Sequence, residues 1–207
     1  MKVEFAGKMI SNLQWQYLQH RYERRTHGQK APKVVEQTHA IMDTFKEFIG
    51  YQGRVLDVGC GNGRYCGKTY TKEDQWYVCH SNEITGLDPS WPQYESRFKV
   101  HRGIGEAMPF DDCVFDAVIM YSALDHVEYP AMVLQECRRV LVPEGKFFIM
   151  NAVFENGRQH SLHMWQWSES ELKRLLSGFF TEEAVISDFE KCDYHILMWR
   201  GGKNGKA

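Results

Sequence analysis

The sequence predicts an α/β fold: a doubly wound, mostly parallel sheet of seven strands with helices on both faces. Short apolar runs typical of buried strands alternate with segments whose apolar residues recur at helical spacing. A glycine-dense loop follows the first strand, which indicates that a ligand approaches the backbone there. The last two strands lie close together in the sequence, which favours an antiparallel hairpin at one edge of the sheet.

The first half of the chain is expected to begin with two helices. One covers residues 11–25 and the other covers 33–49, where apolar residues lie on one helical face until Gly53 ends the helix. The elements expected next are strands at 54–59, 83–89 and 98–103, with a short helix at 64–70 between the first two.

The second half continues the alternation of strands and helices. Its expected elements are a strand at 115–123, a helix at 130–141, a turn at 143–145, a strand at 146–153, a helix from 169, and strands at 182–190 and 194–200. The late helix has a defined start, because Ser168 with Glu171 three residues later forms a capping-box pattern.

Composition predicts one domain. The 207 residues are 43% hydrophobic and 25% charged, as in ordinary globular proteins. Within residues 1–207 we expect N-terminal helices that cover the site at 1–50, a ligand-binding core at 51–152, and an acceptor-side segment with the last strands at 153–200. The net charge of -2 argues against a basic nucleic-acid-binding surface, so no nucleic-acid partner is expected.

Other sequence features favour a cytoplasmic location. The first ten residues lack the apolar stretch of a secretory signal, and no apolar run approaches membrane-spanning length. The six cysteines are scattered without a C-x-x-C pair, which argues against a disulfide framework and against a zinc-cysteine cluster.

The glycine loop limits the class of ligand. Gly59, Gly61 and Gly63 follow G-x-G-x-G spacing, whereas the dinucleotide fingerprint needs a glycine where Arg64 stands. Asp57 precedes the loop, and its carboxylate would repel a pyrophosphate but suit a ligand that carries an ammonium group. A phosphate-binding P-loop is excluded because no G-K-[ST] follows.

A second acid, Asp88, ends the second predicted strand in "TGLDPS". A carboxylate at this edge of the sheet can accept hydrogen bonds from both hydroxyls of a ribose. The alternative is a turn-forming Asp-Pro pair without a ligand.

With these residues in order, the chain resembles the class I S-adenosylmethionine-dependent methyltransferases, and more narrowly their small-molecule branch that includes quinone-biosynthesis methyltransferases. The matching stretches are "VLDVGCGNG", "GLDPS", "GEAMPFDDCVFDAVIMYSALDHV" and "ECRRVLVPEGKFFIM". The resemblance implies a Rossmann-like methyltransferase fold, with S-adenosylmethionine as the cofactor.

The resemblance also implies which residues bind the cofactor. They are Asp57, Gly59, Cys60, Gly61, Asp88, Pro89, Gly105, Glu106 and Tyr121. Those of the first loop would hold the methionine moiety, Asp88 the ribose, the pair at 105–106 the adenine edge, and Tyr121 the region of the sulfonium. Many relatives carry an adenine-binding aspartate where Ile104 stands, and Ile104 cannot form that bond.

His126 is the expected catalytic residue, because the resemblance implies that it faces the acceptor. Transfer of an activated methyl group needs mainly proximity, but an acceptor hydroxyl or ammonium also needs a base. Histidine suits this role because it exchanges protons near neutral pH. The alternative is that His126 only packs or forms hydrogen bonds. Asp125 and Glu128 are weaker candidates, expected to be exposed or helix-capping.

Acceptor specificity is expected from two segments that flank the core. Their candidate residues are Trp15, Tyr17, His20, Tyr22 and Arg25 in the first, and Arg158, His160, His163, Trp165 and Trp167 in the second. The two histidines of the second segment raise the question of a metal. Because the sequence shows no third ligand, no metal is expected.

The predicted function is therefore methyl transfer from S-adenosylmethionine to an oxygen or nitrogen of a small-molecule acceptor. Three alternatives remain. One is methylation of a macromolecule such as RNA or protein, another is cofactor binding without catalysis, and the third is a nicotinamide oxidoreductase, which Arg64 disfavours. No N-P-P-Y or D-P-P-Y follows the fourth strand, which argues against methylation of nucleobase amino groups.

Overall fold

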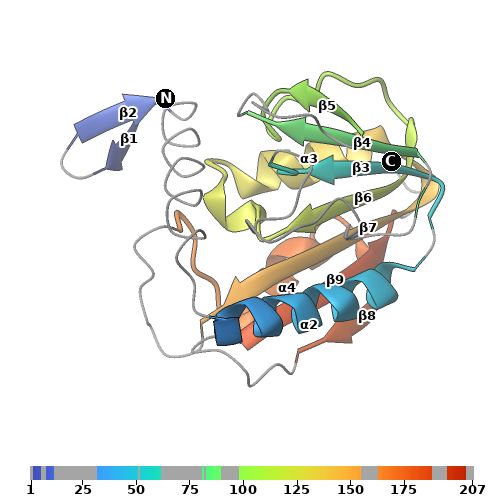
Figure 1. Cartoon of the computed structure of the whole chain (residues 1–207). Coiled ribbons are helices and arrows are strands. Elements are labelled where there is room, and N and C mark those ends of the chain that lie inside the picture. Colours follow the sequence, from blue (N-terminus) through green and yellow to red (C-terminus); the bar gives the residue numbers. More distant parts are fainter. Residues whose placement is uncertain are drawn as a thin grey trace.

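The computed structural model describes residues 2–5, 8–11, 32–50, 52–61, 81, 83–89, 98–154, 163–187 and 195–203. Its main feature is a seven-stranded sheet in the order β5-β4-β3-β6-β7-β9-β8 (Figure 1). The strands are β3 (Arg54–Val58), β4 (Glu83–Asp88), β5 (Lys99–Arg102), β6 (Phe115–Tyr121), β7 (Leu141–Val153), β8 (Thr181–Ile186) and β9 (His195–Gly202).

Strand direction and order confirm the predicted doubly wound sheet. The strands from β5 to β7 pair in parallel, and β9 pairs antiparallel with both β7 and β8. The chain moves outward from β3 to β5 and then returns to the other side of β3 with β6. The switch point therefore lies between β3 and β6, and open α/β sheets bind ligands beyond the carboxyl ends of the strands at this point.

Helices cover both faces of the sheet. Figure 1 shows α2 (Pro32–Ile49) in front of the sheet, with α3 (Pro130–Val140) and α4 (Glu169–Ser177) behind it. Successive strand residues supply the two cores in turn: Val55 packs with α2, and Leu56 packs with α3 and α4. This alternation is the period of two that a strand imposes on its side chains.

Apolar side chains at helical spacing explain why α2 lies against the sheet. Ile41, Met42, Phe45 and Ile49 are buried there with strand residues such as Phe148. The sequence predicted this helix at 33–49, and the structure confirms it within one residue at its start. In the described part of the chain, no helix is long and apolar enough to cross a membrane.

Short sequence patterns predicted the start of α4 correctly but not the start of β7. The capping box at Ser168 is present, with Glu171 N–H donating to the Ser168 hydroxyl at 3.3 Å. The turn expected at 143–145 falls inside the bounds of β7, where the register against β6 shifts and Glu144 has a φ of 64°. The antiparallel edge formed by β8 and β9 is as predicted.

The N-terminal segment contains a hairpin that the sequence does not predict. Strands β1 (Lys2–Phe5) and β2 (Lys8–Ser11) form a separate two-stranded antiparallel sheet. The helix expected at 11–25 lies almost entirely outside the described residues, and the helix expected at 64–70 lies wholly outside them.

Candidate active site

The glycine loop is described as far as Gly61, with Gly63 outside the described residues, and this part follows β3 and contacts the end of β4. The backbone N–H of Gly59 donates to the carbonyl of Leu87 at 2.8 Å, and that of Cys60 donates to the same oxygen at 3.4 Å. Gly59 and Gly61 have φ values of 79° and 60°, a region that favours glycine. A Cβ added to Gly59 would lie 2.5 Å from the Cβ of Ala123, so only glycine fits there.

Two buried acids stand beside this loop. Asp57 is 4% exposed and Asp88 is 6% exposed, each at the carboxyl end of its strand. Their positions in the strand alternation place both on the α2 face of the sheet. One oxygen of Asp88, Oδ2, accepts the N–H of Gly61 at 2.8 Å, so Asp88 also holds the loop in place.

The loop after β5 is tied to the start of α3 by Glu106. Its Oε1 accepts the backbone N–H groups of Glu128 at 2.9 Å and of Tyr129 at 3.3 Å. Gly105 packs so closely on Val133 that an added Cβ would lie 3.0 Å from a methyl group. Gly105 and Glu106 therefore hold this loop against α3 and the residues just before it. The sequence did not predict this contact.

Two side chains of α3, Glu136 and Arg139, also hold the loop after β5. The Oε2 of Glu136 accepts the N–H of Met108 at 2.8 Å, and Arg139 donates to the Met108 carbonyl at 3.1 Å. Arg139 Nε also donates to Glu136 Oε1 at 2.7 Å. This hydrogen bond from Arg139 is the main reason that the pKa of the Glu136 carboxyl is lowered.

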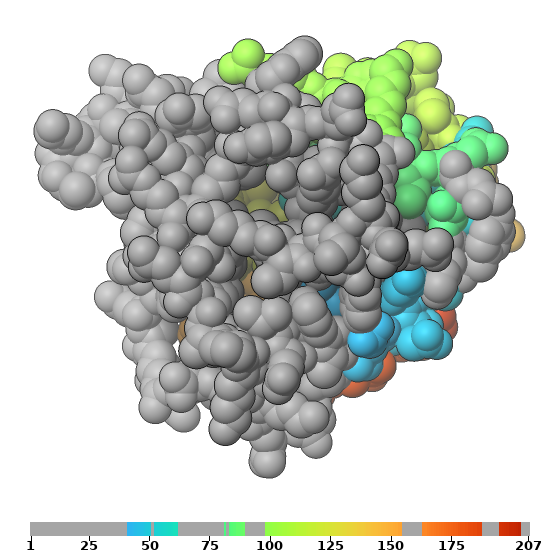
Figure 2. All heavy atoms as spheres, in the orientation of Figure 1, coloured from blue at the N-terminus to red at the C-terminus, as the bar shows by residue number. Residues whose placement is uncertain are grey.

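The segment after β6 lies beside the glycine loop and continues toward the side of the site where the acceptor is expected. Tyr121 closes the strand with its ring 5.8 Å from that of Phe45, and Ser122 has a φ of 47°. The 3-10 helix η1 (Leu124–His126) begins immediately after Ala123, the residue that meets Gly59. Figure 2 shows, at the right of the same view, the green and yellow-green atoms of the β4 and β5 region above the blue atoms of the end of α2.

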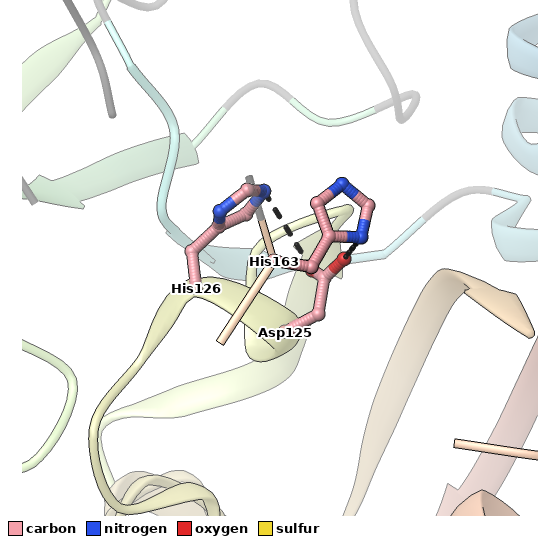
Figure 3. A group of neighbouring side chains, drawn as sticks. All are labelled: Asp125, His126 and His163. Atoms are coloured by element: carbon pink, nitrogen blue, oxygen red, sulfur yellow. Dashed lines mark ion pairs between the residues drawn. The ribbon is translucent and has the colours of Figure 1, made fainter. Parts of the chain in front are cut away.

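Three titratable side chains gather at η1 (Figure 3). Asp125 Oδ2 lies 2.8 Å from His163 Nδ1, and Asp125 Oδ1 lies 3.9 Å from His126 Nε2. The two imidazoles meet edge to face with ring centroids 4.8 Å apart. We call Asp125, His126 and His163 the acceptor-side cluster.

The expectation that Asp125 and Glu128 are exposed or helix-capping is wrong. Asp125 is 1% exposed and Glu128 is 5% exposed. Burial by itself raises the pKa of the Asp125 carboxyl, but the neighbouring His126 and His163 outweigh that effect and hold this pKa below its ordinary value.

Backbone hydrogen bonds bring His163 to η1. The carbonyl of Asp125 accepts the N–H groups of Met164 at 2.9 Å and Trp165 at 3.1 Å. The indole of Trp165 donates to the carbonyl of Val127 at 2.9 Å. Three hydrogen bonds thus hold the segment around His163 to Asp125 in η1 and to Val127 just after it.

The structure unites most predicted site residues but does not describe all of them. Asp57, Asp88, the glycine loop and the 105–106 pair come from three adjacent strands, and His126 lies beyond the fourth. Pro89 follows β4 directly. Some candidates for acceptor specificity lie outside the described residues, namely Trp15, Tyr17, His20, Tyr22, Arg25, Arg158 and His160. Asp125 was undervalued by sequence reasoning, and its only signal was its position beside His126.

Comparisons with known proteins found a matching family and partial relatives. Residues 56–149 match the methyltransferase domain family. The chain is 29% identical to a tRNA U34 carboxymethyltransferase of Saccharophagus degradans over 49% of this chain and 33% of that protein. It is 28% identical to a probable S-adenosylmethionine-dependent methyltransferase of Mycolicibacterium smegmatis over 63% of this chain and 53% of that protein. The chain therefore spans about half the length of these relatives or less.

The fold is also similar to that of solved methyltransferases. One is the Burkholderia thailandensis 1,6-didemethyltoxoflavin-N1-methyltransferase, whose structure contains 1,6-didemethyltoxoflavin and S-adenosylhomocysteine. It superposes with a TM-score of 0.64 at 18% identity, covering 98% of this chain and 93% of that one. At this level of identity the similarity establishes the fold.

The hydrogen bonds that Glu136 accepts from Met108 and Arg139 should contribute to the free energy of unfolding. Because the folded-state pKa of Glu136 is lowered, its carboxylate stabilises the folded protein above the ordinary carboxyl pKa of 4.5. Glu136→Gln should lower the free energy of unfolding at neutral pH by about 1 kcal/mol. The difference from wild type should shrink as the pH falls below 4.5 through the lowered pKa.

Urea denaturation at several pH values measures this difference. Glu47→Gln, at an exposed position of α2, is the matched control and should match the wild type. A Glu136→Gln deficit that stays constant down to acid pH would show that the charge of Glu136 does not stabilise the fold.

Proposed function

Because this chain belongs to the class I S-adenosylmethionine-dependent methyltransferases, we propose that it transfers a methyl group to an oxygen or nitrogen of a small molecule. The observation that carries the proposal is the convergence of the glycine loop, two buried acids and the acceptor-side cluster at one edge of the sheet. The cofactor is S-adenosylmethionine, the cofactor of this family. It supplies a methyl group that its sulfonium already activates.

The described residues fit this cofactor. A Cβ is excluded at Gly59 because Ala123 occupies that position, so the loop backbone is held against the segment that follows β6. The buried carboxylate of Asp57 is suited to the ammonium group of the methionine moiety, and that of Asp88 to the ribose hydroxyls. The backbone at Gly105 and Glu106 would meet the adenine edge, since Ile104 offers no polar side chain.

Transfer of the methyl group to the acceptor needs fewer protein side chains than cofactor binding does. Holding the acceptor in line with the methyl group supplies most of the acceleration. A hydroxyl or ammonium acceptor must also lose a proton. His126 lies three residues after Ala123, the residue that contacts Gly59 of the glycine loop. We assign to His126 the role of promoting the loss of the acceptor's proton.

Two observations support a small-molecule acceptor. The net charge of -2 provides no general attraction for a polyanion. The Burkholderia methyltransferase, whose fold this chain shares, is named for a small-molecule substrate. The second candidate is methyl transfer to RNA, which the partial similarity to a tRNA carboxymethyltransferase favours.

The role of Asp88 is tested by two substitutions. Asp88→Asn keeps an acceptor oxygen for Gly61 but removes the charge and one acceptor for the ribose. It should weaken S-adenosylhomocysteine binding by about 1–3 kcal/mol while leaving the melting temperature nearly unchanged. Asp88→Ala should lower both, because the loop then loses its hydrogen bond.

Isothermal titration calorimetry with S-adenosylhomocysteine measures these affinities. Asp116→Asn is the control, because Asp116 pairs with Arg54 at the opposite end of the strands. Wild-type affinity in Asp88→Asn would remove Asp88 from the cofactor site.

The role of His126 is tested by turnover. His126→Ala should lower the rate of methyl transfer by roughly 100-fold or more, which is the usual contribution of a side chain that assists proton transfer. Affinity for S-adenosylhomocysteine should stay the same, because His126 is assigned to the acceptor. His101→Gln, on the edge strand β5, is the control and should retain both properties. Full turnover by His126→Ala with the true acceptor would exclude this role.

A further inference from the structure

We propose that the acceptor-side cluster, Asp125, His126 and His163, binds a divalent transition-metal ion of the Zn²⁺ class. The sequence offers only His163 and its neighbour His160 as candidate ligands. The fold adds the carboxylate of Asp125 and the imidazole of His126, which lie 38 and 37 positions before His163 in the chain. Two imidazoles and one carboxylate form a donor set that first-row divalent metals prefer.

The spacing of the donor atoms suits one ion. One ligand atom from each residue can be chosen so that all three lie within 4.8 Å of one another. Bonds of about 2.0–2.2 Å in a tetrahedral zinc site hold ligand atoms roughly 3.4 Å apart. The contacts of 2.8 Å and 3.9 Å lie on either side of that value but involve the two different oxygens of Asp125, so the carboxylate and the two rings must rotate to bring three donor atoms onto one ion.

The environment of Asp125 favours a cation at this point. Its Oδ1 is buried, and no hydrogen bond from another residue reaches it within the described part of the structure. A buried carboxylate oxygen without such a bond is costly. A cation between Oδ1 and the imidazoles would satisfy this oxygen.

The cluster is held in place before any ion binds. Two backbone hydrogen bonds to the Asp125 carbonyl fasten the segment that carries His163, and the Trp165 indole adds a third to Val127. The ring of Phe154 packs against His163 with centroids 5.9 Å apart. Side chains fixed in this way lose little freedom on binding, which favours metal affinity.

The position of the site suggests what the ion would do, and this part rests on the proposed function. Three protein ligands leave at least one coordination position open, as in catalytic zinc sites. An acceptor hydroxyl or amine bound there would lose its proton to solvent more readily. Its freed lone pair would then form the bond to the methyl carbon while the carbon–sulfur electron pair remains on sulfur. His126 would thus promote proton loss as a metal ligand.

The site itself is tested by metal titration of the full chain. After treatment with a chelator, the protein is titrated with ZnCl₂ by calorimetry and with CoCl₂ by visible absorption. We expect one ion per chain, with cobalt bands typical of nitrogen and oxygen ligands. His163→Ala and Asp125→Asn should each weaken binding at least 10-fold, while His101→Gln should bind as the wild type does.

Circular dichroism identifies any variant that fails to fold. If Asp125→Asn does not fold, His163→Ala decides the matter, because its side chain is partly exposed and its loss leaves the sheet core intact. Absence of stoichiometric binding to the wild type, or unchanged binding by folded His163→Ala and His126→Ala, would overturn the proposal. Neither cofactor nor acceptor is present in this titration, so its outcome is independent of methyl transfer.

Discussion

The close approach of Gly59 to Ala123 is the constraint on which the site depends. Parallel pairing of β3 with β6 delivers the loop after one strand and η1 after the other to the same edge of the sheet. The absence of a side chain at Gly59 lets the two segments touch, since a Cβ would lie 2.5 Å from that of Ala123. A cofactor bound at the glycine loop therefore lies next to whatever the segment after β6 presents.

Carboxylates hold the surrounding loops in place; Asp88 and Glu106 are buried, and Glu136 is partly exposed. Asp88 accepts a backbone N–H from the glycine loop, Glu106 accepts two from the start of α3, and Glu136 accepts one from the loop after β5. Each acid is stabilised in place by hydrogen bonds from backbone groups that would otherwise need water. The site is thus built from polar contacts between loops, above two apolar cores that set the strand positions.

Local patterns in the sequence predicted most of the fold. Short apolar runs predicted the strands of the large sheet, helical spacing predicted α2, and Ser168 with Glu171 predicted the start of α4. Four ordered stretches, among them the glycine loop and the acid at position 88, also predicted the resemblance to methyltransferases, and residues 56–149 match a methyltransferase domain. These features depend on residues that are close in the chain, and therefore their physical causes can be recognised in a short window.

The acceptor-side cluster could not be predicted in the same way. Asp125 and His163 meet because backbone hydrogen bonds fasten a distant segment to η1, and no local pattern encodes that contact. Asp125 looked like an exposed residue because its burial depends on that segment. The register shift in β7 likewise depends on pairing with β6, which the turn signal at 143–145 does not reveal.

The most direct test of the central claim follows the methyl group itself. The protein is incubated with methyl-labelled S-adenosylmethionine and a cell extract separated into small molecules, RNA and protein. We predict that label enters the small-molecule fraction, and that heat-inactivated protein transfers none. Label confined to RNA or protein would contradict the small-molecule acceptor. No transfer to any fraction, although S-adenosylhomocysteine binds, would contradict the assignment as a methyltransferase.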